Sequence, residues 1–162
     1  MIRDARVEDA PEIAAIYGHY VAHSTVSFEE VAPSVDEMAQ RIAKTLESYP
    51  YIVDVVDGDL HGYAYAGPYR PRSAYRFTAE TTVYVHKDAQ GQGTGRRLYA
   101  SLIERLRSTE AHLLIGAITL PNPASEALHK SFGYQRAGLL SEVGRKFDRW
   151  HDVALWQLPL DA

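Results

Sequence analysis

The stretch from Thr81 to Tyr99 restricts the fold most, and it reads TTVYVHKDAQGQGTGRRLY. It starts with the β-branched and aromatic residues of a strand, turns at Gly91, Gly93 and Gly95, and continues with the apolar spacing of a helix. A glycine-rich turn between a strand and a helix is a common way to bind phosphate, because glycine lets backbone N–H groups approach the anion and the helix N-terminus favours negative charge. The sequence therefore predicts an anion-binding loop, with Arg96 and Arg97 behind it as sources of positive charge for hydrogen bonds to the anion.

Three other interpretations of this loop fit less well. A nucleotide-binding P-loop needs a lysine directly after its last glycine, and none is present. A dinucleotide site needs the spacing G-x-G-x-x-G and an acidic residue at the end of the next strand, whereas this loop has G-x-G-x-G and Glu110 precedes that strand. The third interpretation is a flexible glycine turn with no ligand.

The whole chain has 162 residues, which indicates a single domain over residues 1–162. The net charge of −4 argues against a nucleic-acid partner, which requires a basic surface. The chain has no cysteine, so disulfides, thiolate nucleophiles and cysteine-based zinc sites are excluded. No apolar run approaches the ~18 residues of a membrane span, and we expect a cytoplasmic protein with no membrane partner.

Strand and helix patterns alternate along the chain, which favours an α/β fold with a mixed central sheet and helices on both faces. Asn122, followed by proline, has the pattern of a helix cap, and Ser34 with Glu37 forms a capping box. We expect helices at 8–21, 35–46, behind the glycine loop and after Asn122, and strands at 2–5, 51–56, 60–66, 78–86, 113–118, 138–146 and 152–158.

Two motifs resemble those of the GCN5-related N-acetyltransferase (GNAT) family. Gln90-x-x-Gly93-x-Gly95 is similar to the family's Gln/Arg-x-x-Gly-x-Gly/Ala loop, and Asn122 opens a helix that a Gly-aromatic pair closes at 133–134. Residues 75–85, 120–122 and 144–158 further resemble the phosphinothricin and methionine sulfoximine acetyltransferases. The resemblance implies a GNAT fold, acetyl-CoA as cosubstrate, no metal, a small amino-acid-like acceptor, a homodimer, and a role in antibiotic or herbicide resistance.

The resemblance also assigns residues to the cosubstrate. The main chain of Val83, Tyr84 and Val85 would bind the pantetheine arm. Asn122 would bond to the same arm, or act only as a helix cap, and Ser131 would reach the distal end of the cosubstrate, or face solvent. The pyrophosphate would lie on the loop formed by Gln90, Gly91, Gln92, Gly93, Thr94, Gly95 and Arg96.

Acetyl transfer to an amine requires a base that removes a proton and an acid for the leaving thiolate. Glu80 is the candidate base, because the resemblance places the catalytic glutamate at this position. The strand pattern alone favours a Glu80 that faces solvent, and the resemblance reverses this interpretation. Many GNAT enzymes carry a tyrosine acid seven residues after the asparagine, where this chain has His129. A protonated imidazole is suited to that role, and a structural histidine is the alternative.

The acceptor site implied by the resemblance contains an arginine that pairs with a carboxylate or phosphinate. Arg72 is the expected residue, and Arg70 and Arg76 remain alternatives. The rival functions are an acetyltransferase for protein N-termini or lysines, and a non-catalytic sensor of coenzyme A. The full set of expected acceptor residues is Phe28, Arg72, Tyr75, Tyr84 and Val153.

Overall fold

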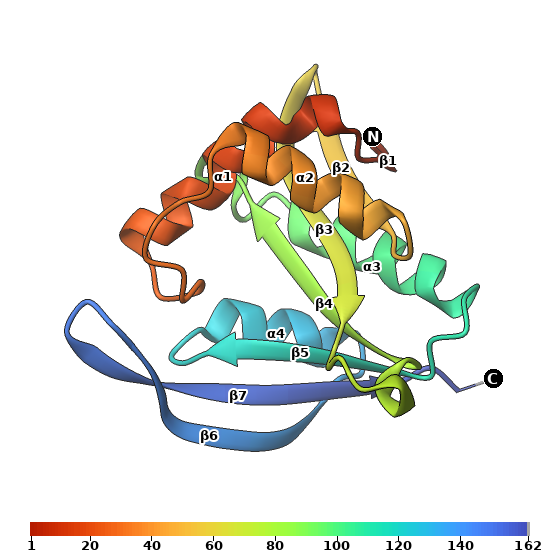
Figure 1. Cartoon of the computed structure of the whole chain (residues 1–162), viewed down its shortest axis with the longest axis vertical. Helices are drawn as coiled ribbons and strands as arrows, with labels where there is room; N and C mark the ends of the chain where they lie inside the picture. The colour runs from red at the N-terminus through yellow and green to blue at the C-terminus, as the bar shows by residue number, and fades with distance from the viewer. Residues whose placement is uncertain (162) are drawn as a thin grey trace.

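The computed structural model describes residues 1–161, which form a seven-stranded sheet in the order β1-β2-β3-β4-β5-β7-β6 (Figure 1). The strands are β1 (Ile2–Asp4), β2 (Tyr51–Val56), β3 (Asp59–Pro68), β4 (Thr78–Val85), β5 (Leu113–Thr119), β6 (Gln135–Lys146) and β7 (Arg149–Pro159). The helices are α1 (Ala10–His23), α2 (Val35–Leu46), α3 (Thr94–Arg107) and α4 (Pro123–Ser131), with short 3₁₀ turns at Val7–Asp9, Ser73–Tyr75 and Lys87–Ala89.

The middle of the sheet opens into a V between β4 and β5. All neighbouring strands run antiparallel except this pair, which is parallel and is matched only at residues 78–80 and 113–115. Beyond this point β5 stays paired with β7 while β4 stays paired with β3, and Figure 1 shows the two halves of the sheet diverging. The divergence leaves one backbone edge of β4 facing the space between the halves.

Helices cover both faces of the sheet, which confirms the expected mixed α/β architecture. Helices α1 and α2 form one core with β2 and β3, centred on Ile13, Ile42 and Val53. Helix α3 packs on the opposite face, where Leu98 and Leu102 belong to a second core that β4, β5 and β7 also share. The sheet thus separates two cores, and the V between β4 and β5 opens at their boundary.

Local sequence signals explain where the helices begin. The Ser34 side chain accepts a hydrogen bond from the Glu37 N–H at 3.1 Å and Glu37 reaches back to the Ser34 N–H at 2.8 Å, which completes the expected capping box. The Asn122 side chain accepts from the Ser125 N–H at 3.1 Å, with Pro123 at the first helical position. Both expected caps are confirmed.

The hairpin formed by β6 and β7 is longer than the sequence indicates. Its turn at Phe147 and Asp148 has φ angles of +54° and +57°, values that glycine and asparagine usually supply, so the turn has no clear sequence signal. The pairing register also shifts between Leu140 and Gly144, where β6 carries extra residues in a bulge. Among residues 1–161, no helix is long and apolar enough to cross a membrane.

Candidate active site

A cavity of about 1500 Å³ occupies the V between β4 and β5. Its walls come from the end of α1, the segment that follows it, the glycine loop at 90–95, the N-termini of α3 and α4, and the β6–β7 hairpin. Expected site residues that line it are Phe28, Glu80, Val83, Tyr84, Val85, Gln90, Gly91, Gly93, Thr94, Gly95, Arg96, Asn122, His129 and Val153.

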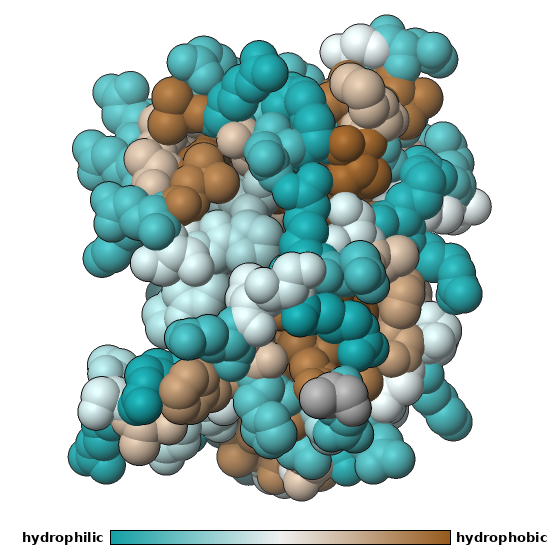
Figure 2. Space-filling model, turned by 90° about the vertical axis from the view of Figure 1, so that its right-hand side faces the viewer, coloured by the Kyte–Doolittle hydropathy of each residue, from teal (hydrophilic) through white to brown (hydrophobic). Residues whose placement is uncertain are grey.

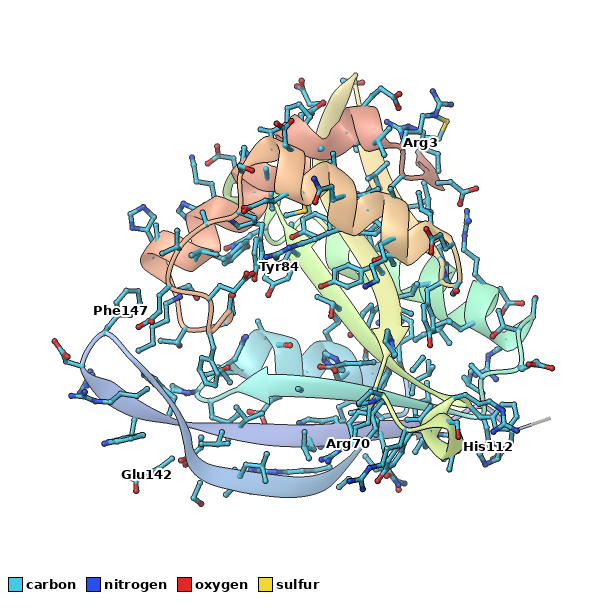
Figure 3. The ribbon with its side chains drawn as sticks, viewed as in Figure 1. Arg3, Arg70, Tyr84, His112, Glu142 and Phe147 are labelled. Carbon is cyan, nitrogen blue, oxygen red and sulfur yellow. The ribbon has the colours of Figure 1, made fainter. Side chains whose placement is uncertain are left out.

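Two residues expected in the acceptor site lie elsewhere in the described chain. Arg72 precedes the 3₁₀ turn at Ser73–Tyr75 and is exposed, and the ring of Tyr75 packs edge-on at 5.8 Å against Tyr69. Neither Arg72 nor Tyr75 lines the cavity, whereas Arg70 and Tyr69 do. Figure 3 shows Arg70 on the connection between β3 and β4. Within the single chain, Arg70 is therefore the arginine of this connection that reaches the cleft. The segment that contains Arg72 and Tyr75 lies outside it.

Two residues expected at the cosubstrate bond instead to neighbouring protein groups. The Gln92 side-chain amide donates to the Asp88 carbonyl at 3.0 Å. The Ser131 hydroxyl donates to the Leu128 carbonyl at 2.7 Å and accepts from Arg96 Nη1 at 3.3 Å. Neither side chain is part of the cavity wall, although Ser131 contacts a residue that is.

The backbone edge of β4 is directed into the cavity. His86 N–H donates to the His61 carbonyl at 2.8 Å, so even-numbered residues of β4 pair with β3, and the backbone groups of residues 81, 83 and 85 point the other way. The Val85 carbonyl accepts from the Tyr20 hydroxyl at 2.5 Å. The N–H and C=O of Val83 face the space that β5 has left, so they are positioned to pair with an extended ligand.

The glycine loop has the backbone conformation that an anion cradle requires. Gly91 and Gly93 have φ angles of +74° and +77°, and Gly93 directly precedes the first turn of α3. The first N–H groups of a helix have no partner within the helix, and the residues that carry them here, 94–96, line the cavity. The Arg97 guanidinium, which follows the loop, instead binds the buried carboxylate of Asp54. The sequence did not reveal this role of Asp54.

Glu80 presents an unpaired carboxylate to the cavity. Its side chain lies on the same face of β4 as those of Thr82 and Tyr84, and partial burial raises the pKa of the Glu80 carboxyl. Within residues 1–161, no salt bridge reaches Glu80. A carboxylate with a raised pKa and no cationic partner has the properties of a general base.

His129 is only 3% exposed and forms hydrogen bonds through both ring nitrogens. Nδ1 lies 2.7 Å from the Ser125 carbonyl, so it carries the proton and donates it, and Nε2 accepts from the Tyr99 hydroxyl at 2.9 Å. Burial lowers the pKa of the imidazole. A lowered pKa makes the imidazole harder to protonate, which weighs against the expected acid, and the catalytic role of His129 stays a prediction.

The Tyr99 hydroxyl belongs to a buried network that His129 completes. The Thr81 hydroxyl lies 3.1 Å from the Tyr99 oxygen and 2.9 Å from the Tyr134 oxygen. A Cβ atom on Gly116 would lie 2.6 Å from His129 Nε2, so glycine at this position makes room for the imidazole. This network connects β4, α3 and α4 beneath the cavity.

Tyrosines form the wall of the cavity next to Glu80. The Tyr84 ring lies 5.3 Å from the rings of Tyr17 and Tyr20, and Figure 3 shows Tyr84 projecting from β4 toward α1. The Tyr17 hydroxyl bonds to Ser27 and to the carboxylate of Glu29, and burial raises the pKa of Tyr17 to about 12. The Tyr17 phenol therefore stays neutral, and the hydroxyls of Tyr17 and Tyr20 are already bonded to protein groups.

A family model described as the acetyltransferase (GNAT) domain matches residues 2–155. The chain belongs to the GNAT family. A phosphinothricin N-acetyltransferase of Alcaligenes faecalis is 50% identical over 163 residues, which span 99% of this chain and 83% of that protein. An L-methionine sulfoximine/L-methionine sulfone acetyltransferase of Pseudomonas paraeruginosa is 39% identical over 162 residues, covering 99% and 94% of the two chains.

A solved structure of an acetyltransferase is also closely similar to this GNAT enzyme. The phosphinothricin acetyltransferase of Sinorhizobium meliloti in complex with acetyl-CoA superposes with a TM-score of 0.95 at 37% identity, covering 98% of this chain and 87% of that one. The fold and the enzyme class expected from the sequence are confirmed, and acetyl-CoA is the cosubstrate.

The cavity of this GNAT enzyme fits acetyl-CoA in three respects. The glycine loop has the left-handed backbone that brings N–H groups to a pyrophosphate, and the Val83 backbone is oriented for an extended amide-containing arm. The cavity volume of about 1500 Å³ exceeds that of an ordinary small-molecule pocket. When bound, acetyl-CoA supplies an activated acetyl thioester. Glu80 lines the same cavity.

Proposed function

We propose that this GNAT enzyme acetylates the α-amine of a small amino-acid-like acceptor, of the class that includes phosphinothricin and methionine sulfoximine, with Glu80 as general base. The names of its relatives support the acceptor class. The observation that carries the proposal is the position of Glu80, whose unpaired carboxylate shares one cavity with the glycine loop. An ammonium has no lone pair, so a base that accepts its proton makes the amine nucleophilic.

We assign the cosubstrate to the following groups. The N–H groups from Gln90 to Arg96 hold the pyrophosphate at the N-terminus of α3, and the backbone of 83–85 pairs with the pantetheine arm. The Asn122 amide remains at the start of α4, where its oxygen caps the helix and its nitrogen is directed away from that cap. Ser131 acts on the distal end through Arg96, because their side chains share a hydrogen bond.

For the acceptor, Arg70 is the cationic residue that lines the cleft of the single chain. Its guanidinium stacks on the Tyr69 ring at 5.1 Å, which orients it without neutralising its charge. We propose that Arg70 or Arg72 pairs with the acceptor carboxylate or phosphinate. Phe28, Tyr84 and Val153 surround the acceptor in the cavity, and Tyr75 contributes through its contact with Tyr69.

We further propose a homodimer, because the β6–β7 hairpin exposes apolar side chains along an edge of the sheet. Leu139, Val143 and Trp150 are 47%, 52% and 59% exposed there. The face in Figure 2, which looks onto the opposite side from the hairpin tip, instead shows hydrophobic groups interrupted by hydrophilic side chains.

We also propose that the enzyme acts in the cytoplasm, where acetyl-CoA is available, without a nucleic-acid or membrane partner, since the net charge is −4. Acetylation of a toxic amino-acid analogue at its amine would neutralise the amine and so confer resistance to the analogue.

The test is a panel of acceptors assayed with acetyl-CoA through release of the free thiol. The panel contains phosphinothricin, methionine sulfoximine, methionine sulfone, natural L-amino acids, and peptides with free N-termini or lysines. We expect the highest kcat/KM with the amino-acid analogues. Preference for the peptides would favour a protein acetyltransferase, and acetyl-CoA binding without turnover of any amine would favour a coenzyme A sensor.

A further inference from the structure

The segment between α1 and α2 forms one wall of the cleft without regular secondary structure. Residues 24–29 of this segment, which we call the acceptor wall, all line the cavity, and Phe28 is 38% exposed within it. Irregular backbone lacks the repeating hydrogen bonds that stabilise a helix or a sheet. Its position must therefore come from contacts with neighbouring elements.

One anchor comes from α2 and holds the far end of the acceptor wall. The Arg41 guanidinium donates two hydrogen bonds to the Glu29 carboxylate, at 2.9 and 2.7 Å. The same carboxylate accepts from the Tyr17 hydroxyl of α1. This anchor ties Glu29, which follows Phe28, to both helices.

The other anchor comes from β6, more than 100 residues away in sequence. The Lys146 side chain is buried, at 3% exposure, and its ammonium donates to the carbonyls of Ser24 at 2.7 Å and Ser27 at 2.8 Å. Figure 3 shows Phe147, the next residue, at the tip of the hairpin beside this segment. An ammonium shared by two carbonyls three residues apart fixes the backbone that leads into Phe28.

The Phe28 ring lies directly against Gly144, which is on β6 like Lys146. A Cβ atom at Gly144 would lie 2.2 to 2.7 Å from three ring atoms of Phe28, closer than any real contact. The bulge between Leu140 and Gly144 brings this part of β6 under the ring, and places Leu140 and Val143 in the cavity beside it. Gly144 therefore determines how deeply the ring sits.

We propose that Lys146 and Gly144 are positioning residues that set acceptor specificity, by fixing the acceptor wall and the depth of the Phe28 ring. The proposal rests on the acetyl transfer proposed above and concerns the acceptor alone. The ring lines the same cavity as Leu140, Val143 and Val153, and these apolar groups suit an acceptor whose side chain combines a polar head with methyl or methylene groups. The Lys146 ammonium bonds to Ser24 and Ser27, and Gly144 lies against Phe28, so neither contact involves a residue assigned to acetyl-CoA.

The first experiment compares Lys146→Met, which cannot donate, with Lys146→Arg, which keeps donors. Lys44→Met, an exposed change on α2, is the matched control. For Lys146→Met we expect the KM for methionine sulfoximine to rise about tenfold or more, as displaced positioning groups do, with the KM for acetyl-CoA within about twofold. Lys146→Arg should raise the KM for methionine sulfoximine less than Lys146→Met does, and Lys44→Met should have the wild-type KM. Amide hydrogen exchange should be faster at residues 25–29 in Lys146→Met only.

The second experiment is a double-mutant cycle between Gly144→Ala and Phe28→Ala, which does not depend on the folding of the lysine variant. Gly144→Ala alone should change the ratio of kcat/KM for phosphinothricin over methionine sulfoximine by about fivefold or more. In the Phe28→Ala background the same change should have no further effect, because the ring that it displaces is gone.

The proposal is overturned if folded Lys146→Met keeps the wild-type acceptor KM, or if Gly144→Ala acts equally with and without the Phe28 ring. It is also overturned if acetyl-CoA KM rises as much as acceptor KM. If the wild type acetylates no acceptor, the proposed function fails, and hydrogen exchange at 25–29 still decides whether Lys146 anchors the wall.

Discussion

The Arg97 guanidinium donates through Nε and Nη2 to a single oxygen of the Asp54 carboxylate, at 3.0 and 2.7 Å. Asp54 lies on β2 with a side chain that is 1% exposed, and Arg97 lies in the first turns of α3. Arg97 Nη1 also donates to the Gln92 carbonyl at 2.9 Å. Through Arg97, the pair therefore connects the glycine loop to β2.

Asp54→Asn should weaken both the fold and the loop. The substitution removes the charge that holds Arg97, and we expect a loss of about 1–3 kcal/mol in the free energy of unfolding. The KM for acetyl-CoA should rise more than the KM for the acceptor, since the Gln92 carbonyl loses its support. Urea unfolding and steady-state kinetics measure the two effects, and an unchanged acetyl-CoA KM would remove Asp54 from the support of the loop.

Glu80→Gln should separate catalysis from stability. Loss of a general base should lower kcat by roughly 10²-fold or more while acetyl-CoA binding is retained. Because burial raises the pKa of Glu80, the folded state binds its proton more tightly than the unfolded state does, and stability falls as the carboxyl ionises. Glutamine removes that penalty, so the melting temperature at pH 7 should be equal or higher. Near wild-type turnover would exclude Glu80 as base.

The pH dependence of kcat/KM should show the raised pKa of Glu80 directly. The base acts only as a carboxylate, so activity should decline as the pH falls, at a midpoint above the ~4.3 of an ordinary glutamate. Glu80→Gln should lose this acidic limb along with its activity. A wild-type profile that stays flat down to the ordinary glutamate range would contradict the assignment.

Gly93→Val should act on acetyl-CoA and spare the acceptor. The φ of +77° at Gly93 is costly for a β-branched residue, and the loop must distort to accept one. We expect the KM for acetyl-CoA to rise about five- to a hundredfold, from about 1–3 kcal/mol of backbone strain. Gly138→Ala is the matched control, because a Cβ there meets nothing within 4 Å. A folded Gly93→Val enzyme with normal acetyl-CoA affinity would disprove the phosphate cradle.

Arg70→Ala and Arg72→Ala compare the two candidate anion sites. A charge-assisted hydrogen bond to the acceptor is worth about 1.5–3 kcal/mol, so kcat/KM should fall roughly ten- to a hundredfold for acceptors with a free carboxylate. Amides of the same acceptors should be spared. We expect the larger loss for Arg70→Ala, because Arg70 lines the cleft of the single chain. A selective loss for Arg72→Ala alone would restore the assignment implied by the sequence.

The parts of the fold that depend on neighbours in sequence were predictable. The helix starts at Ser34 and Asn122 follow from side chains that cap the backbone three residues away, and the order of strands and helices follows from the spacing of apolar residues. The glycine loop is equally local, since its function depends on backbone torsions that glycine alone adopts easily.

Contacts between distant segments decided the rest. The sequence by itself determined the element order, the glycine loop and the position of Glu80 on a strand. Only the tertiary structure decided that β4 and β5 diverge, that His129 is buried and its pKa lowered, that Arg70 reaches the cleft, and that Lys146 holds a segment 122 residues away. The physical reason is that burial and hydrogen-bond partners set the charge and orientation of a side chain, and both depend on packing between segments that no local pattern records.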